Sequence, residues 1–129
     1  MTGNKYDVVV LGGGPGGYVA AIRASQLGNT VAIVEKDAMG GICLNWGCIP
    51  TKALLKDSEV LHVVKNAAKY GIKISNYSVD FGVTVKRSRS VAKRLSKGIE
   101  YLMKKNEIYH IKGIGKLKSV KEVEVTDTK

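Results

Sequence analysis

The sequence is poor in the residues and segments that mark disulfide-stapled, secreted and membrane-spanning proteins. It has two cysteines, two prolines and one phenylalanine in 129 residues, so a scaffold held by several disulfides is excluded and a reducing compartment is favoured. No apolar run approaches the length of a membrane span. Residues 1–6 have neither the apolar core of a signal peptide nor the arginines of a transit peptide. We therefore predict one cytoplasmic domain with a single core and no membrane partner.

Acidic residues are scarce beside basic ones, 11 against 21, which gives a net charge of +10. Residues 1–83 hold eight basic and six acidic residues, whereas residues 84–129 hold thirteen and five. Few aromatic residues are interleaved with this basic segment, unlike in sites that stack nucleic-acid bases. The segment is therefore predicted to be a solvated helix face rather than a nucleic-acid site.

The chain opens with the order strand, glycine turn, helix, strand. Residues 6–11 are rich in valine, which is typical of a strand buried on both faces in a parallel sheet. A G-x-G-x-x-G pattern at 12–17, a helical stretch to about Leu27 and an apolar strand at 30–34 follow. Glu35 ends that strand, 18 positions after the last glycine. A glycine turn alone is weak evidence, but this context predicts a dinucleotide-binding α/β fold.

Each glycine of the turn has a physical task in such a site. Gly12 permits the tight turn, Gly14 lets the backbone approach a pyrophosphate, and Gly17 lets the helix pack on the strand. The amides at the helix start face the phosphates, and Glu35 accepts hydrogen bonds from ribose hydroxyls. The turn does not choose between NAD and FAD, because both present an adenosine-diphosphate half.

Both cysteines lie in residues 41–52, ahead of a predicted helix. Pro50 suits the first turn of that helix. Cys48 is then expected just outside the helix N-terminus, where unpaired amides favour the thiolate. Cys43 lies one loop upstream, so the pair is either a dithiol/disulfide couple or two ordinary reduced thiols. A redox couple needs a two-electron partner, which favours FAD.

No metal site is expected. The C-x4-C spacing does not match a zinc knuckle, and His62 and His110 have no ligand-spaced neighbours. Lys52 is either an ordinary solvated lysine or a cation that stabilises negative charge at the redox centre. Trp46 is expected to shield the site.

The remainder of the chain predicts two long helices and a small sheet. A helix over about 51–70 is ended by Gly71, a surface loop covers 72–82, and a second helix covers about 83–105. The buried stripe of the second helix is predicted to be Val91, Leu95, Ile99 and Leu102. Three short strands, at 108–112, 116–119 and 122–125, predict an antiparallel meander with turn glycines at Gly113 and Gly115.

Residues 11–24 and 40–52 resemble the flavin-dependent pyridine nucleotide–disulfide oxidoreductases. The C-L-N-x-G-C-I-P loop and the G-G-Y-V-A-A-I-R helix start are most similar to the members that oxidise dihydrolipoamide for 2-oxoacid dehydrogenase complexes. The resemblance covers essentially the whole chain and is most specific in the first 55 residues or so. It implies a Rossmann-like FAD-binding fold, a parallel sheet with flanking helices plus the small meander.

The resemblance also implies roles for single residues. Cys43 would be the interchange thiol, Cys48 the charge-transfer thiolate beside the flavin, and Lys52 a neighbour of the flavin ring. Electrons would pass from dihydrolipoamide through the Cys43–Cys48 disulfide and FAD to NAD+. The implied cofactor contacts are Gly12, Gly14, Pro15, Gly16, Gly17, Glu35, Lys36, Gly41, Ile42, Cys43, Cys48, Lys52 and Gly115.

Three positions depart from the family pattern. Ile42 replaces a threonine or valine, so only its N–H remains for a pyrophosphate contact. Thr51 replaces a common serine, and Trp46 replaces a smaller apolar residue beside the disulfide.

Family members are several times longer than this chain and carry separate NAD, central and interface domains. Residues 1–129 are therefore expected to be the N-terminal part of an FAD-binding domain, inactive alone, from a homodimeric family member that oxidises dihydrolipoamide. A dihydrolipoyl domain is the expected partner, and the mitochondrial matrix is the expected location in a eukaryote. The alternatives are a glutathione- or mercuric-reductase-type enzyme and a non-catalytic flavin-binding redox module.

Overall fold

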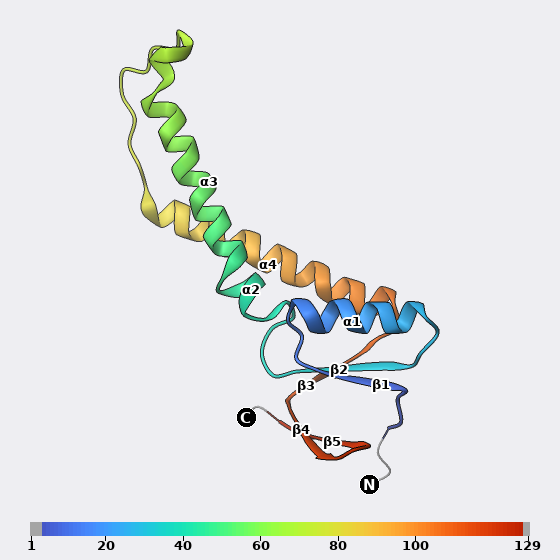
Figure 1. Cartoon of the computed structure of the whole chain (residues 1–129). Helices are drawn as coiled ribbons and strands as arrows, with labels where there is room; N and C mark the ends of the chain where they lie inside the picture. Colours follow the sequence, from blue (N-terminus) through green and yellow to red (C-terminus); the bar gives the residue numbers. More distant parts are fainter. Residues whose placement is uncertain (1–3, 128–129) are drawn as a thin grey trace.

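The structure, a computed structural model, describes residues 4–127 (Figure 1). Its elements in chain order are β1 (Val8–Leu11), α1 (Pro15–Gln26), β2 (Val31–Glu35), α2 (Gly41–Asn45), α3 (Cys48–Lys65), the 3-10 helix η1 (Ala67–Tyr70), α4 (Phe81–Lys105), β3 (Tyr109–Lys112), β4 (Ile114–Ser119) and β5 (Glu122–Thr126). The ends of the predicted domain, residues 1–3 and 128–129, lie outside the described residues. Within residues 4–127, none of the helices combines the length and apolar character that crossing a membrane requires.

A three-stranded parallel sheet in the order β1-β2-β3 forms the centre of the fold. Val8 of β1 pairs with Val31 of β2, and Ala32 of β2 pairs with Tyr109 of β3. Helices α1 and α4 lie over one face of this sheet, and the β4–β5 hairpin lies over the other (Figure 1). The predicted Rossmann-like α/β fold with flanking helices and a small antiparallel unit is confirmed.

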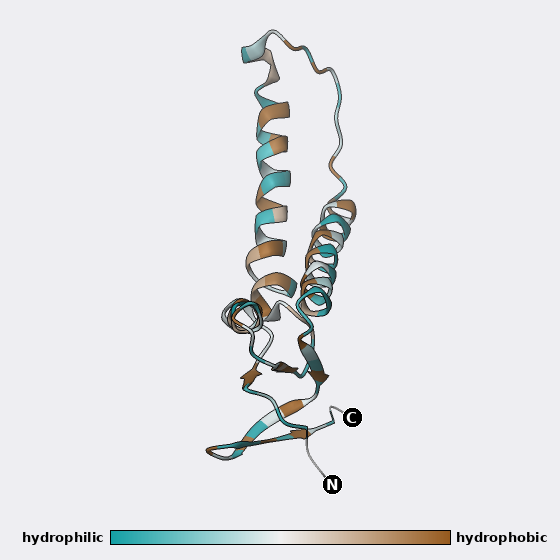
Figure 2. Ribbon diagram, turned by 90° about the vertical axis from the view of Figure 1, so that its right-hand side faces the viewer, coloured by the Kyte–Doolittle hydropathy of each residue, from teal (hydrophilic) through white to brown (hydrophobic). Residues whose placement is uncertain are grey.

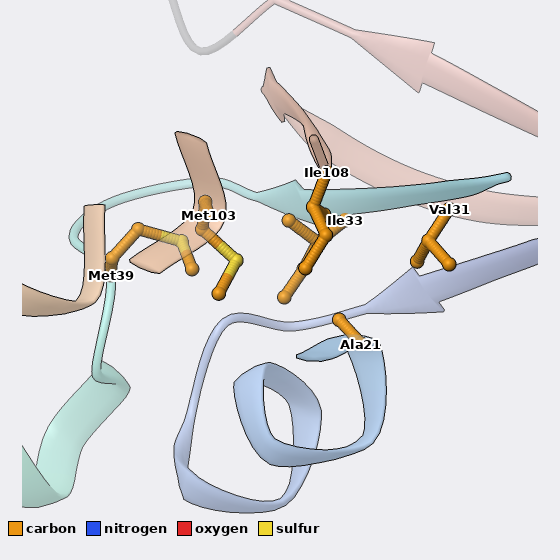
Figure 3. Packing of buried hydrophobic residues seen from close by; sticks show 6 residues of the cluster. All are labelled: Ala21, Val31, Ile33, Met39, Met103 and Ile108. Carbon is orange, nitrogen blue, oxygen red and sulfur yellow. The ribbon is translucent and has the colours of Figure 1, made fainter. Parts of the chain in front are cut away.

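The core lies between the sheet and the two helices that cover it. Figure 3 shows its buried side chains gathered next to β2 and α1: Ala21, Val31, Ile33, Met39, Met103 and Ile108. Every residue of β2 is buried, as expected for a central parallel strand. Burial of one large side chain such as Ile33 stabilises the fold by about 1.5–3 kcal/mol.

The predicted three-stranded meander is wrong in one strand. Tyr109–Lys112 forms β3, which pairs with β2 in the parallel sheet. Within residues 4–127, the antiparallel pairing is confined to β4 and β5. The reason is that α4 is a crossover connection: it runs across one face of the sheet, so that β3 starts at the same end as β2 and pairs parallel with it. The bend that releases the chain from this sheet is at Gly113, whose φ of +155° favours glycine.

Strand β1 is not buried on both faces as predicted. Its burial alternates, with Val9 and Leu11 on the exposed side at 38% and 41% exposure. Within residues 4–127, β1 has β2 as its only strand neighbour and therefore forms an edge of the sheet. An apolar run of this length is compatible with an edge strand as well as a central one, so the sequence pattern alone did not predict the exposed side of β1.

Helix α3 and the N-terminal part of α4 form an arm that extends away from the sheet (Figures 1 and 2). The predicted helix over 51–70 corresponds to α3 and η1, and Gly71 ends it with a φ of +75°. The predicted second helix is α4, which starts two residues earlier because the Asp80 carboxylate accepts a hydrogen bond from Val83 N at 3.1 Å. Much of the apolar side of the outer arm is exposed, as at Leu55, Val60, Val63, Tyr70 and Phe81.

The predicted buried stripe of α4 is wrong in part, although Ile99 and Leu102 pack against the core. Leu95 is 40% exposed, and Val91, Ile99 and Leu102 are half-buried. The buried line follows the small residues Ser88, Ala92 and Ser96 and ends at Met103. Small side chains let α4 approach its neighbours closely, and each serine hydroxyl donates to a backbone carbonyl, which makes its burial tolerable.

A glycine pair in α1 tests the packing of the first helix on β1. We expect Gly17→Ala to lower the free energy of unfolding by about 3 kcal/mol, because the added Cβ would overlap Gly12 O. Gly16→Ala is the matched control, since its Cβ would meet nothing within 4 Å, and it should be neutral or slightly stabilising. Urea unfolding of both variants measures the difference. Equal stability of the two would contradict the close packing at Gly17.

Candidate functional site

The glycine turn joins the carboxyl end of β1 to the N-terminus of α1. Gly12 has a φ of +97°, and its N–H donates to Val34 O at 2.8 Å. Gly14 is the N-cap of α1 and Pro15 its first residue. Gly17 packs against Gly12 O. The conformational tasks predicted for Gly12 and Gly17 are therefore confirmed, and the free amides at the start of α1 form an anion-binding end.

Open space lies over this turn. A Cβ built on Gly12, Gly14 or Gly16 would meet no atom within 4 Å, so the backbone of the turn is accessible to a ligand. By contrast, a Cβ on Gly41 would lie 2.9 Å from Gly14 Cα. The segment that leads into α2 thus touches the turn backbone to backbone. These features fit a pyrophosphate held by main-chain amides.

Glu35 has two backbone partners in the site. Its Oε2 accepts from Gly13 N at 2.7 Å and its Oε1 accepts from Asp37 N at 2.8 Å. The carboxylate is buried and fixes the glycine turn to the end of β2, a role that the sequence analysis missed. Each carboxylate oxygen keeps a second lone pair, so the predicted ribose contact stays compatible with this geometry.

Lys36 and Gly115 flank the same edge of the sheet. Lys36 follows Glu35 and is exposed. Gly115 is a residue of β4 rather than of a turn, which corrects the prediction for it. A Cβ there would lie 2.6 Å from Leu11 Cδ2 and 3.1 Å from Val34 Cγ1. A side chain at this position would have to displace Leu11, so glycine favours the crossing of β4 over the carboxyl ends of β1 and β2.

The two cysteines lie on two consecutive helices. Cys43 is in the middle of α2, not in a loop, and Cys48 is the first residue of α3, not outside it. Pro50 is the third residue of α3 and is buried. Cys48 keeps the predicted relation to the helix N-terminus, because the first-turn amides still lack intrahelical acceptors.

The turn between these helices brings the cysteines together. A Cβ on Gly47 would lie 3.2 Å from Ile42 O and 3.5 Å from Cys43 Cα, so this glycine permits a close approach of α3 to α2. Cys43 is half-buried and Cys48 is exposed, and both are free thiols. Contact with Cys48 is the main cause that raises the pKa of the Cys43 thiol. A negative charge on Cys48 also opposes loss of the Cys43 proton.

Lys52 is four residues after Cys48 on α3 and so shares its face of the helix. Its charge counteracts the rise in the pKa of Cys43 by favouring the thiolate, which places the cation beside the dithiol as predicted. Ile42 is 75% exposed. Trp46, the C-cap of α2, is 52% exposed, so it is not buried over the sulfur atoms.

Comparison with known proteins decides the family. The sequence profile described as pyridine nucleotide-disulphide oxidoreductase matches residues 6–129. The chain belongs to the pyridine nucleotide-disulphide oxidoreductases. Its relatives within that family include the dihydrolipoyl dehydrogenase of Rhizobium etli, which is 54% identical over 94% of this chain. The dihydrolipoyl dehydrogenase of Zymomonas mobilis is 50% identical over 97% of this chain.

The relative from Arabidopsis thaliana, named dihydrolipoyl dehydrogenase 1, mitochondrial, is 51% identical over 95% of this chain. The matched regions are 25%, 27% and 24% of the Rhizobium, Zymomonas and Arabidopsis proteins. The chain therefore spans about a quarter of the length of these oxidoreductases.

The causes of the Cys43 pKa shift can be separated by mutation. We expect Cys48→Ala to lower the pKa of Cys43, because it removes both the contact and the competing thiolate. Lys52→Met should raise this pKa further, because it removes the opposing cation. The measurement is the rate of Cys43 alkylation by iodoacetamide across pH, followed by peptide mass spectrometry.

The control for this titration is Lys56→Met. Lys56 lies one turn beyond Lys52 and pairs with Glu59 at 3.0 Å, so its loss should leave the pKa of Cys43 unchanged. A shift as large as that of Lys52→Met would argue against a local effect of Lys52.

Proposed function

We propose that this chain is the N-terminal part of an FAD-binding domain from an enzyme that oxidises dihydrolipoamide and reduces NAD+. The observation that carries the proposal is a dithiol formed by Cys43 of α2 and Cys48 of α3, on a segment whose Gly41 touches the glycine turn through Gly14. The names of the relatives and their shared oxidoreductase family support it. The NAD, central and interface domains belong to other parts of the longer enzyme.

The residues present fit FAD. The amides at the start of α1 and the open backbone of Gly14 and Gly16 would hold the pyrophosphate. Glu35, with Lys36 beside it, would contact the ribose of the adenosine half, and the N–H of Ile42 and the backbone of Gly115 would complete the contacts. When bound, FAD supplies the two-electron chemistry that connects a dithiol to a nicotinamide.

The chain's own part in the reaction is thiol–disulfide exchange. A thiolate of dihydrolipoamide attacks Cys43 Sγ of the Cys43–Cys48 disulfide, and Cys48 leaves as the thiolate. The second substrate thiol, after losing its proton, attacks the substrate sulfur bonded to Cys43, which closes the lipoamide ring and releases Cys43. Two electrons and two protons have then left the substrate. The cation of Lys52 and the N-terminus of α3 stabilise the thiolate at Cys48.

The proposal extends to partners and location. The dihydrolipoyl domain of a 2-oxoacid dehydrogenase complex would present the substrate, and the longer enzyme would act as a homodimer. The proposed location is the cytoplasm, or the mitochondrial matrix for a eukaryotic source, by analogy with the Arabidopsis relative that is named mitochondrial.

FAD binding is tested by alkylation of the two cysteines. Saturating FAD should slow the reaction of exposed Cys48 with iodoacetamide about tenfold, because the ring would cover it, while half-buried Cys43 stays reactive. Gly14→Val is the matched variant, since its side chain would enter the ligand space without meeting a protein atom within 4 Å of Cβ. It should abolish protection. Equal protection in both proteins, or none in either, would contradict the proposed site.

The substrate class is tested on the oxidised, FAD-loaded chain. Dihydrolipoamide should release both cysteine thiols about tenfold faster per thiol than glutathione does, because its second thiol acts within the same molecule. Samples are acid-quenched over time, and the fraction of reduced Cys43 and Cys48 is measured by iodoacetamide labelling and peptide mass spectrometry, with Cys43→Ser as the blank. Faster release by glutathione would favour the glutathione-reductase-type alternative.

A further inference from the structure

Helix α4 bonds to both helices that carry the cysteines. Arg87 Nη1 donates to Ala53 O of α3 at 3.1 Å and to Asp57 Oδ1 at 2.8 Å. On the other side, Ser96 Oγ donates at 2.7 Å to Met39 O, two residues before the start of α2. Helix α4 thus bonds both to α3 and to the segment that leads into α2.

The Ser96 bond is the most enclosed of these contacts. Ser96 is 7% exposed, and Met39 is fully buried. Met39 O also accepts from Asn45 Nδ2 at 3.1 Å, and the same amide donates to Gly41 O at 3.0 Å. One carbonyl therefore ties α4 to both ends of α2, with Cys43 between them.

We propose that Ser96 is a positioning residue for the dithiol: through Met39 O and Asn45 it fixes α2 so that Cys43 faces Cys48. Arg87 fixes α3 in the same way, through its bonds to Ala53 O and Asp57. The inference rests on the proposed function in one respect, the assignment of Cys43 and Cys48 as the redox couple. It adds that contacts from α4 determine how readily their disulfide forms.

The consequence is a defined reduction potential. The disulfide takes two electrons and two protons from two glutathione molecules and yields two cysteine thiols and one glutathione disulfide. Its stability depends on the effective concentration of one protein thiol at the other, which falls when α2 is free to move. Loss of the Ser96 bond should therefore make the disulfide easier to reduce.

A second buried serine on α4 supplies the control. Ser88 is 2% exposed, and its hydroxyl donates to Val85 O at 2.7 Å, within α4 itself. Ser96→Ala and Ser88→Ala each remove one buried hydroxyl from the same line of the same helix. Only Ser96→Ala removes a bond to the segment that carries Cys43. Ser96→Thr, which keeps the hydroxyl, is the conservative variant.

The experiment equilibrates the full chain with glutathione buffers of known ratio and measures the fraction of Cys43–Cys48 disulfide by mass spectrometry after acid trapping. We expect Ser96→Ala to lower the equilibrium constant for disulfide formation about tenfold, an upward shift of about 30 mV in potential. Ser88→Ala and Ser96→Thr should stay near the wild type. Arg87→Met should shift the constant in the same direction as Ser96→Ala, and circular dichroism verifies that each variant is folded.

Two results would overturn the inference and leave the proposed function intact: an unchanged constant in Ser96→Ala, or an equal shift in Ser88→Ala. A wild-type chain that forms no Cys43–Cys48 disulfide in any buffer would overturn both the inference and the proposed function.

Discussion

The candidate site depends on close main-chain contacts between glycine residues, which have no side chain to hold the two segments apart. The segment at residues 40–41 reaches the glycine turn because Gly41 lies against Gly14 and because Gly40 N donates to Gly13 O at 2.8 Å. Glu35 holds Gly13 from the other direction. These contacts fix the segment that enters α2 directly against the N-terminal end of α1. The cysteine segment is thus joined to the glycine turn by main-chain contacts, while the side chains of Ser96 and Arg87 hold it from α4.

The opening of the chain was the most predictable part, because glycine there has conformational meaning. The positive φ of Gly12, the close packing of Gly17 and the position of Glu35 all follow from the spacing of residues 12–35. The spacing of Cys43 and Cys48 left two alternatives open, a redox couple or two ordinary thiols, and the contact between the two thiols is compatible with the first. The helical state of Cys43 was not predicted, because α2 is one short helix whose Asn45 side chain bonds back to its own first residue.

Later elements were less predictable because tertiary contacts decided them. The sequence of β3 suits an antiparallel pair as well as a parallel one, and only the path of α4 places it beside β2. In α4, the prediction considered large apolar residues, whereas the buried line is formed by the small residues Ser88, Ala92 and Ser96. Their four-residue spacing was the available signal, since small residues at that period mark a face of close helix approach. In α3, α4 covers mainly the first turns, where Arg87 meets Asp57, and leaves apolar residues such as Val60 and Val63 exposed.

The pairing of β2 with β3 has a consequence for how the protein is made. Ala32 and Tyr109 are neighbours in the sheet, yet the whole cysteine segment and the arm lie between them in the chain. Closing so long a loop is entropically costly and slows folding relative to local contacts. During synthesis the central strand stays without its second partner until β3 has left the ribosome. The thiols therefore emerge first, on helices whose final alignment waits for a strand that is translated much later.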